Sequence, residues 1–184
     1  MAKKNREHTS VLTEKEILRQ RAKTLAEPIK EALSEWTNDH QETLCFSLKN
    51  ELYSIDIQYI TESLRLHELI PIPGTSSLLT GITHIRGRII PVVNLKAFFH
   101  LGQQGIPASP TVVILSKNQT EVAILVDDIS GTRWISASAI KPPPSTVQGI
   151  SLEHIQGITA DGIILIHGER LLSTLHQQLT QVQL

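Results

Sequence analysis

The chain of 184 residues is poor in cysteine, in aromatic residues and in long apolar runs. Its single cysteine, Cys45, excludes an intramolecular disulfide, and we expect it to be a small buried hydrophobic residue in a strand. No segment approaches the roughly 20 apolar residues of a transmembrane helix, and no apolar segment follows the charged start Met1–Arg6 as in a secretory signal. We therefore expect a cytoplasmic protein that does not insert into the membrane.

The aromatic residues number only three Phe, two Trp and two Tyr, so the core must consist mainly of Ile, Val and Leu. β-branched side chains suit strands, and a hydrophobic fraction of 40% is enough for a packed core. The formal net charge of −1 argues against a nucleic-acid binder that uses a broad basic surface. The expected partners are therefore proteins or small molecules.

Motifs for catalysis and metal binding are also missing. None of the eight histidines has a second histidine or a cysteine at the spacing of a metal site, so we predict no metal and no cofactor. There is no glycine-rich phosphate loop and no G-x-S-x-G nucleophile motif. The pair Asp127–Asp128 could act as general acid and base, but an aspartate after a strand usually caps a turn through its own backbone. We expect no enzymatic activity.

The first forty residues have a helical pattern. Thr13 and Glu16 fit a capping box. Pro28 interrupts the pattern, so we predict one helix over about 14–26 and a second or kinked helix to about 37. This helical extension, residues 1–40, either packs on its own chain or docks a partner. Its apolar residues recur at alternating steps of four and three, as on one helix face: Leu18, Ala22, Leu25, Ile29, Ala32 and Trp36.

From Leu44 onward the apolar residues follow a period of two, which indicates β-strands. One hairpin is predicted over 44–57 with a turn at Asn50–Glu51, and a second over 111–127 with a turn at 116–119. A strand is predicted over 87–94, where Pro91 favours an edge position or a bulge. The run Pro142–Pro144 predicts a stiff connection that is not part of a central strand.

The two hairpins belong to a weak internal repeat. The tripeptide Gly-Ile-Thr occurs at 81–83 and again at 157–159, and each copy is followed by a glycine and an Ile-Ile pair. Closure of five short strands into a barrel removes most exposed edges. We therefore predict an all-β domain over 41–184 that consists of two five-stranded barrels sharing one core boundary.

The most distinctive segment, Leu79–Leu95, resembles the signature of the CheW family of chemotaxis coupling proteins. His84 stands in place of the usual asparagine, Asn94 in place of the usual aspartate, and His167, further on, in place of another aspartate. The resemblance covers residues 42–176 and implies the CheW-like fold, two SH3-like barrels with an apolar groove between them. The matching residues of the segment are Gly81, Arg86, Gly87, Pro91, Val92 and Leu95.

The resemblance also implies a function, namely a non-enzymatic scaffold that couples chemoreceptors to a CheA-type histidine kinase. One surface would hold the CheW-like regulatory domain of the kinase, and the groove would receive the cytoplasmic tip of a methyl-accepting chemoreceptor. The expected partner contacts are Ile60, Glu62 and Arg86, with Gly81 and Gly87 shaping the loop. From its position alone, Arg86 is either a structural residue at a tight bend or a partner contact.

Two other functions stay open from the sequence. A small-molecule-binding β-barrel sensor or regulatory subunit would hold a ligand in its interior, although the strands contain few aromatic residues and few clustered polar ones. An enzyme would use Asp127 or a cluster of histidines. A sensor differs from a scaffold in that its metabolite raises its thermal stability as the ligand concentration increases.

Overall fold

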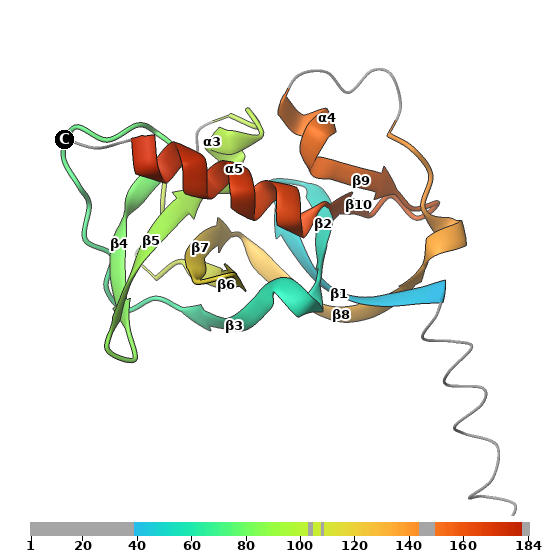
Figure 1. Ribbon diagram of the computed structural model, residues 1–184, viewed down its shortest axis with the longest axis horizontal. Helices are drawn as coiled ribbons and strands as arrows, with labels where there is room; N and C mark the ends of the chain where they lie inside the picture. The colour runs from blue at the N-terminus through green and yellow to red at the C-terminus, as the bar shows by residue number, and fades with distance from the viewer. Residues whose placement is uncertain (1–38, 103–104, 108, 144–149, 182–184) are drawn as a thin grey trace, which may run out of the picture. The chain divides into compact units, whose positions relative to one another are not determined.

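The computed structural model describes residues 39–102, 105–107, 109–143 and 150–181. The helices predicted within residues 1–38 lie outside the described residues. The described chain consists mostly of strands in two five-stranded sheets, with a few short helices and one longer one (Figure 1). The predicted all-β class is therefore confirmed at the level of secondary structure and sheet composition.

The first sheet, sheet A, has the strand order β8-β1-β2-β10-β9. The predicted first hairpin is its β1–β2 pair, but the turn is Lys49–Asn50 and not Asn50–Glu51. Lys49 takes a left-handed φ of 61°, so that two residues suffice for the turn. The strands are β1 (His40–Leu48), β2 (Glu51–Asp56), β8 (Asp128–Ser136), β9 (Ile155–Ile158) and β10 (Ile164–Ile166).

The second sheet, sheet B, has the order β3-β6-β7-β5-β4. It contains the predicted second hairpin, β6–β7, and the predicted strand over 87–94, which is β5. The hairpin turn is shorter than predicted, because Asn118 and Gln119 alone make it with φ of 48° and 68°. The strands are β3 (Ile60–Arg65), β4 (Leu79–Ile85), β5 (Arg88–Asn94), β6 (Thr111–Lys117) and β7 (Thr120–Val126).

Pro91 does not place β5 at an edge of the sheet, since β5 lies between β7 and β4. Pro91 pairs with Ile82 of β4, whereas the parallel ladder with β7 begins only at Val92. At the proline, β5 therefore has a neighbouring strand on one side only. This is locally the situation of an edge strand, where a missing N–H is tolerated.

The chain passes from sheet A to sheet B and back once. It leaves sheet A after β2 through the 3-10 turn η1 (Ile57–Tyr59), forms all of sheet B over 60–126, and re-enters sheet A at β8. The predicted repeat is visible in the matching strand order of the sheets. However, each sheet joins a hairpin from one half of the repeat to three strands from the other half, so the sheets are not the separate halves.

In each sheet, an isolated bridge joins the chain beyond one edge strand to the opposite edge strand. Ile70 and Ile82 exchange backbone hydrogen bonds of 2.8 and 2.9 Å in sheet B, and Lys141 and Ile158 exchange bonds of 3.0 and 2.8 Å in sheet A. A Cβ atom on Gly81 would lie 2.9 Å from the carbonyl carbon of Ile70. A Cβ atom on Gly157 would lie 2.5 Å from the carbonyl oxygen of Lys141. The repeated glycines therefore make room for these two bridges.

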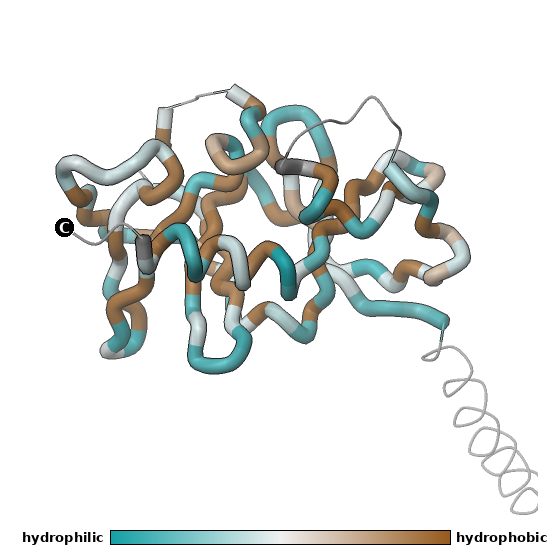
Figure 2. Tube along the Cα trace, turned by 45° about the horizontal axis from the view of Figure 1, so that its top comes forward, coloured by the Kyte–Doolittle hydropathy of each residue, from teal (hydrophilic) through white to brown (hydrophobic). Residues whose placement is uncertain are grey.

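Three apolar clusters form the core, one in each sheet and a larger central one shared by both. Along β6, Val112 and Ile114 belong to the sheet B cluster, whereas Val113 and Leu115 belong to the central cluster. Both faces of β6 are thus buried, which explains its unbroken apolar sequence. Figure 2 shows hydrophobic residues along the strands and hydrophilic residues at the hairpin turns. Cys45 is fully buried in the sheet A cluster, as predicted.

The C-terminal helix α5 (Gly168–Gln181) was not predicted. Leu171, Leu172 and Leu175 belong to the central cluster, and the helix packs against β6 and β7 (Figure 1). Together with Leu179 these leucines are spaced as on one helix face, so the signal was present in the sequence. The shorter helices are α3 (Leu95–Phe98), the 3-10 turn η2 (Ala137–Ala139) and α4 (Ile150–His154).

Candidate partner-binding surface

The β4–β5 turn brings two of the predicted partner contacts together. Arg86 and Gly87 form a two-residue turn with φ of 50° and 81°. Glycine adopts this left-handed conformation without strain, whereas an arginine there does so less readily. From the turn, the Nη2 atom of Arg86 reaches the Oε2 atom of Glu62 on β3 at 2.9 Å. The structure thus joins residues 24 positions apart in the sequence, which no spacing rule connects.

This ion pair is unequally exposed, with 75% of the Arg86 side chain and 18% of the Glu62 side chain accessible to solvent. The second carboxylate oxygen of Glu62, Oε1, is buried and accepts no hydrogen bond from the described residues. A guanidinium has five N–H donors, and the Arg86 side chain that carries them is mostly exposed. Glu62 therefore holds the arginine in place while its remaining donors could bind a carboxylate or carbonyl of another protein.

The other predicted contacts lie elsewhere on sheet B. Ile60 is the first residue of β3, pairs with Leu115, and is partly buried against the central cluster. Gly81 lies near the other end of β4 from the Arg86 turn, at the bridge to Ile70. The structure therefore brings Glu62, Arg86 and Gly87 together, and it separates Gly81 from them.

Six large apolar side chains among the described residues are exposed, and none of them was a predicted contact; three are considered as partner contacts. Ile89 is 70% exposed and follows the Arg86 turn on β5, Trp134 is 53% exposed on β8, and Ile57 is 38% exposed in η1. Single exposed apolar residues are common, but Ile89 lies beside an exposed arginine in a tight turn. Its sequence surroundings, Ile89–Val93, look like a buried strand, so the sequence contained no sign of its exposure.

Three positions depart from the CheW signature, and the structure shows that two of them lie at the starts of helices and one on an exposed part of a strand. The Oδ1 atom of Asn94 accepts hydrogen bonds from the backbone N–H groups of Lys96 (3.0 Å) and Ala97 (3.3 Å), so Asn94 is the N-cap of α3. Asparagine and aspartate are nearly equal as N-caps. His167 precedes α5, and its carbonyl accepts the N–H of Leu171 at 3.0 Å. His84 is exposed on β4, opposite Ile89.

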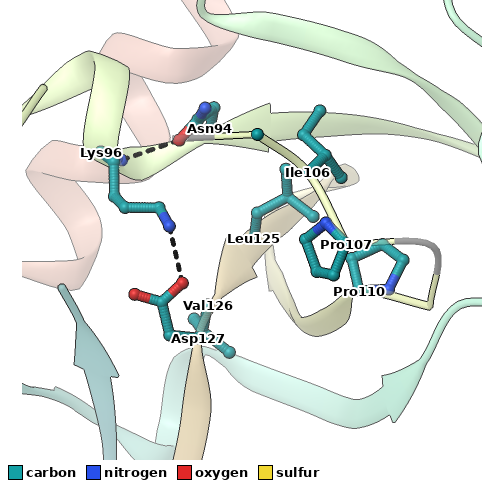
Figure 3. Close-up of a pocket in the computed structure, with 9 residues that line it drawn as sticks. Asn94, Lys96, Ile106, Pro107, Pro110, Leu125, Val126 and Asp127 are labelled. Carbon is teal, nitrogen blue, oxygen red and sulfur yellow. Dashed lines mark hydrogen bonds and ion pairs between the residues drawn. The ribbon is translucent and has the colours of Figure 1, made fainter. Parts of the chain in front are cut away.

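Asp127 does not cap a turn through its own backbone, so that prediction was wrong. Its Oδ1 atom is paired with the Nζ atom of Lys96 (Figure 3), and the two atoms lie 2.6 Å apart. Its Oδ2 atom accepts the backbone N–H of Lys49 at 2.6 Å. Both carboxylate oxygens are thus engaged in bonds to distant segments. The pocket that is lined by both Lys96 and Asp127 has a volume of about 20 Å³. A space of that size holds about one water molecule, and not a substrate.

The described residues contain no group of three or more His, Cys, Asp or Glu side chains that could hold a metal ion. Burial raises the pKa of the Cys45 thiol, which keeps it in the unreactive protonated form near neutral pH. The apolar cluster of sheet B is closely packed with buried side chains such as Ile90, Val92 and Ile114. A ligand in the core of sheet B, as one form of the sensor alternative would require, would have to displace these side chains.

In the described part of the chain, helices are too short or too polar to cross a membrane.

Comparisons with known proteins agree with this geometry. A family model described as CheW-like domain matches residues 42–176. Chemotaxis protein CheW of Klebsiella aerogenes is 34% identical over 139 residues, covering 73% of this chain and 82% of that protein. Protein FrzA of Myxococcus xanthus is 27% identical over 152 residues, covering 80% of this chain and 94% of that protein. The crystal structure of the scaffolding protein TtCheW from Thermoanaerobacter tengcongensis matches this structure with a TM-score of 0.61 and 32% sequence identity. The match covers 68% of this chain and 88% of that chain.

Proposed function

The chain belongs to the CheW family, and on this basis we propose that it couples chemoreceptors to a CheA-type histidine kinase without catalysis of its own. The observation that carries the proposal is the match to the CheW-like domain over residues 42–176, with two matching five-stranded sheets in the structure. The proposal includes a cytoplasmic CheW-like domain over 41–184 whose sheets are SH3-like barrels. Its partners are the CheW-like regulatory domain of the kinase and the helical cytoplasmic tip of a methyl-accepting chemoreceptor.

A rigid adaptor suits this task, because binding of the receptor can then change the activity of the kinase through the adaptor that both proteins contact. The central cluster and α5 hold the sheets together, and the packed interiors leave little room for deformation. An amphipathic receptor helix binds by laying its apolar face on an exposed apolar surface. Exposed Ile57 and Trp134 supply such surface where the chain passes between the sheets and on β8. Coupling free energies between two partners are typically about 1–3 kcal/mol.

At the residue level, we propose that Arg86 contacts a partner directly and that Glu62 positions it. Support comes from the 2.9 Å ion pair and from the strong exposure of the arginine compared with its carboxylate. Ile89 adds an apolar contact beside the turn, and Gly87 allows the turn its left-handed backbone. Interfaces commonly combine an arginine with an apolar residue in this way.

The test is a binding measurement with the cognate kinase regulatory domain and a receptor-tip fragment. We expect Arg86→Glu and Ile89→Ser each to weaken binding at least about fivefold, the loss of a contact of about 1 kcal/mol. Ile89→Ser should change the thermal midpoint little, because this side chain is 70% exposed. Arg86→Glu should lower it, because the substitution removes the ion pair and places a second carboxylate beside Glu62. Arg170→Glu, an exposed arginine on α5, is the matched control and should leave binding unchanged. A wild-type protein that binds neither partner would contradict the proposed function.

A charge swap separates the structural role of the pair from the contact role of Arg86. The double variant Glu62→Arg/Arg86→Glu restores an ion pair between β3 and the turn with reversed polarity. If Arg86 binds a partner, the swap should recover stability relative to Arg86→Glu alone but not binding. Recovery of binding together with stability would show that the arginine acts only by holding the turn.

A further inference from the structure

One carboxylate connects the two sheets at the point where the chain returns from sheet B to sheet A. β7 ends at Val126 and β8 begins at Asp128, so Asp127 alone forms this connection. Its backbone N–H donates to the carbonyl of Ser47 on β1 at 3.0 Å. Its side chain bonds the backbone N–H of Lys49 in the β1–β2 turn and the ammonium of Lys96 in α3. Asp127 thus binds segments of both sheets at once.

The Lys96 end of this connection is largely buried. Only 9% of the Lys96 side chain is exposed, compared with 33% of the Asp127 side chain. Among the ion pairs of the described residues, it is the one in which a side chain is more than nine-tenths buried. A buried ammonium is costly unless it is paired, so Lys96 holds Asp127 on the sheet B side.

The Lys49 end carries the connection to sheet A. The left-handed turn conformation of Lys49 accompanies the bond of its N–H to Asp127, at 2.6 Å. The Nζ atom of Lys49 also donates to the carbonyl of Leu101, which lies three residues after α3, at 2.8 Å. The β1–β2 turn is therefore bonded to sheet B by its backbone and by its side chain.

We propose that Asp127 is a positioning residue that sets the position of sheet A relative to sheet B. The central cluster holds the sheets together, but apolar burial is non-directional, whereas hydrogen bonds at its border are directional. A receptor helix that contacts both sheets binds best when their relative position is fixed in advance. This consequence rests on the proposed adaptor function, while the positioning role itself does not.

The test compares two double variants in which the buried ammonium is removed. Lys96→Met/Asp127→Asn keeps an oxygen that can accept the Lys49 N–H, and Lys96→Met/Asp127→Ala does not. Spin labels on Ser63→Cys of β3 and Ser130→Cys of β8 report the distance between the sheets, since both positions are exposed and Cys45 is buried. Binding of the receptor-tip fragment is measured separately on the unlabelled proteins.

We expect the asparagine variant to keep the narrow distance distribution and to bind within about twofold of Lys96→Met alone. The alanine variant should show a broader or shifted distribution and about three- to tenfold weaker binding, the effect of one hydrogen bond. Equal distance distributions for the two variants would overturn the positioning role. If the Lys96→Met background does not fold, Asp127→Asn and Asp127→Ala are compared with native Lys96. Wild-type protein that fails to bind the receptor would refute only the adaptor function, because the distances still test Asp127.

Discussion

Substitution of Gly81 by alanine tests whether the two isolated bridges depend on the repeated glycines. A Cβ atom at this position would lie 2.9 Å from the carbonyl carbon of Ile70 and 3.1 Å from the Cα atom of Pro71. Both neighbours are backbone atoms, so the segment Ile70–Pro71 must move away. The movement would break the two backbone hydrogen bonds between Ile70 and Ile82, which measure 2.8 and 2.9 Å.

The size of the effect follows from those two bonds. A net contribution of about 0.5–1.5 kcal/mol for each bond gives a loss of about 1–3 kcal/mol in the free energy of unfolding. For a domain of this size, such a loss lowers the thermal midpoint by about 2–12 °C. Hydrogen exchange of the Ile70 and Ile82 amides should accelerate more than that of amides in β6 and β7, because only the bridge is opened locally.

The matched control is Gly105→Ala, since a Cβ atom there would have no neighbour within 4 Å. Its thermal midpoint should stay close to that of the wild type. Gly157→Ala should behave like Gly81→Ala, because a Cβ atom there would lie 2.5 Å from the carbonyl oxygen of Lys141. If Gly81→Ala melts and exchanges like Gly105→Ala, the bridge does not depend on this glycine and the reasoning is refuted.

Three further predictions concern helix ends and pH. Asn94→Ala should lower the unfolding free energy by about 0.5–2 kcal/mol through loss of the α3 N-cap, and Asn94→Asp should be nearly neutral, as chemical denaturation can measure. His167→Asp should stabilise the protein by about 0.5–1.5 kcal/mol, because aspartate is a better N-cap for α5; an unchanged midpoint would show that the end is already satisfied. The hydrogen bond from Lys117 lowers the pKa of Glu169, so the ion pair stabilises the fold above the ordinary carboxylate value of 4.5 and is lost at lower pH. Thermal melts should therefore show a small deficit of Glu169→Gln at pH 7 that shrinks as the pH is lowered below 4.5, and a deficit that persists unchanged in acid would contradict this.

The local patterns of the sequence predicted the parts of the fold that depend on near neighbours. The period of two found the first hairpin, since alternation along a strand reflects burial of alternate side chains. Short apolar runs bounded by turn residues found the second hairpin and β5. The order of short motifs identified the family. The repeated Gly-Ile-Thr tripeptide indicated two equivalent sites, and the structure shows that each of them contains an isolated bridge. The C-terminal helix was missed, although its leucines are spaced for it, because its helical period follows directly on the apolar run of a strand.

The tertiary structure alone decided everything that depends on which distant segments meet. No local pattern shows that the hairpin of one repeat half pairs with strands of the other half, because strand pairing depends on global packing. For the same reason, the pairing of Glu62 with Arg86 and the bonds of Asp127 to Lys49 and Lys96 appear only once the strands are placed. Ile89 and Ile90 are chemically identical neighbours, yet one is exposed and the other buried, because the side of the sheet that each faces is set by the whole fold.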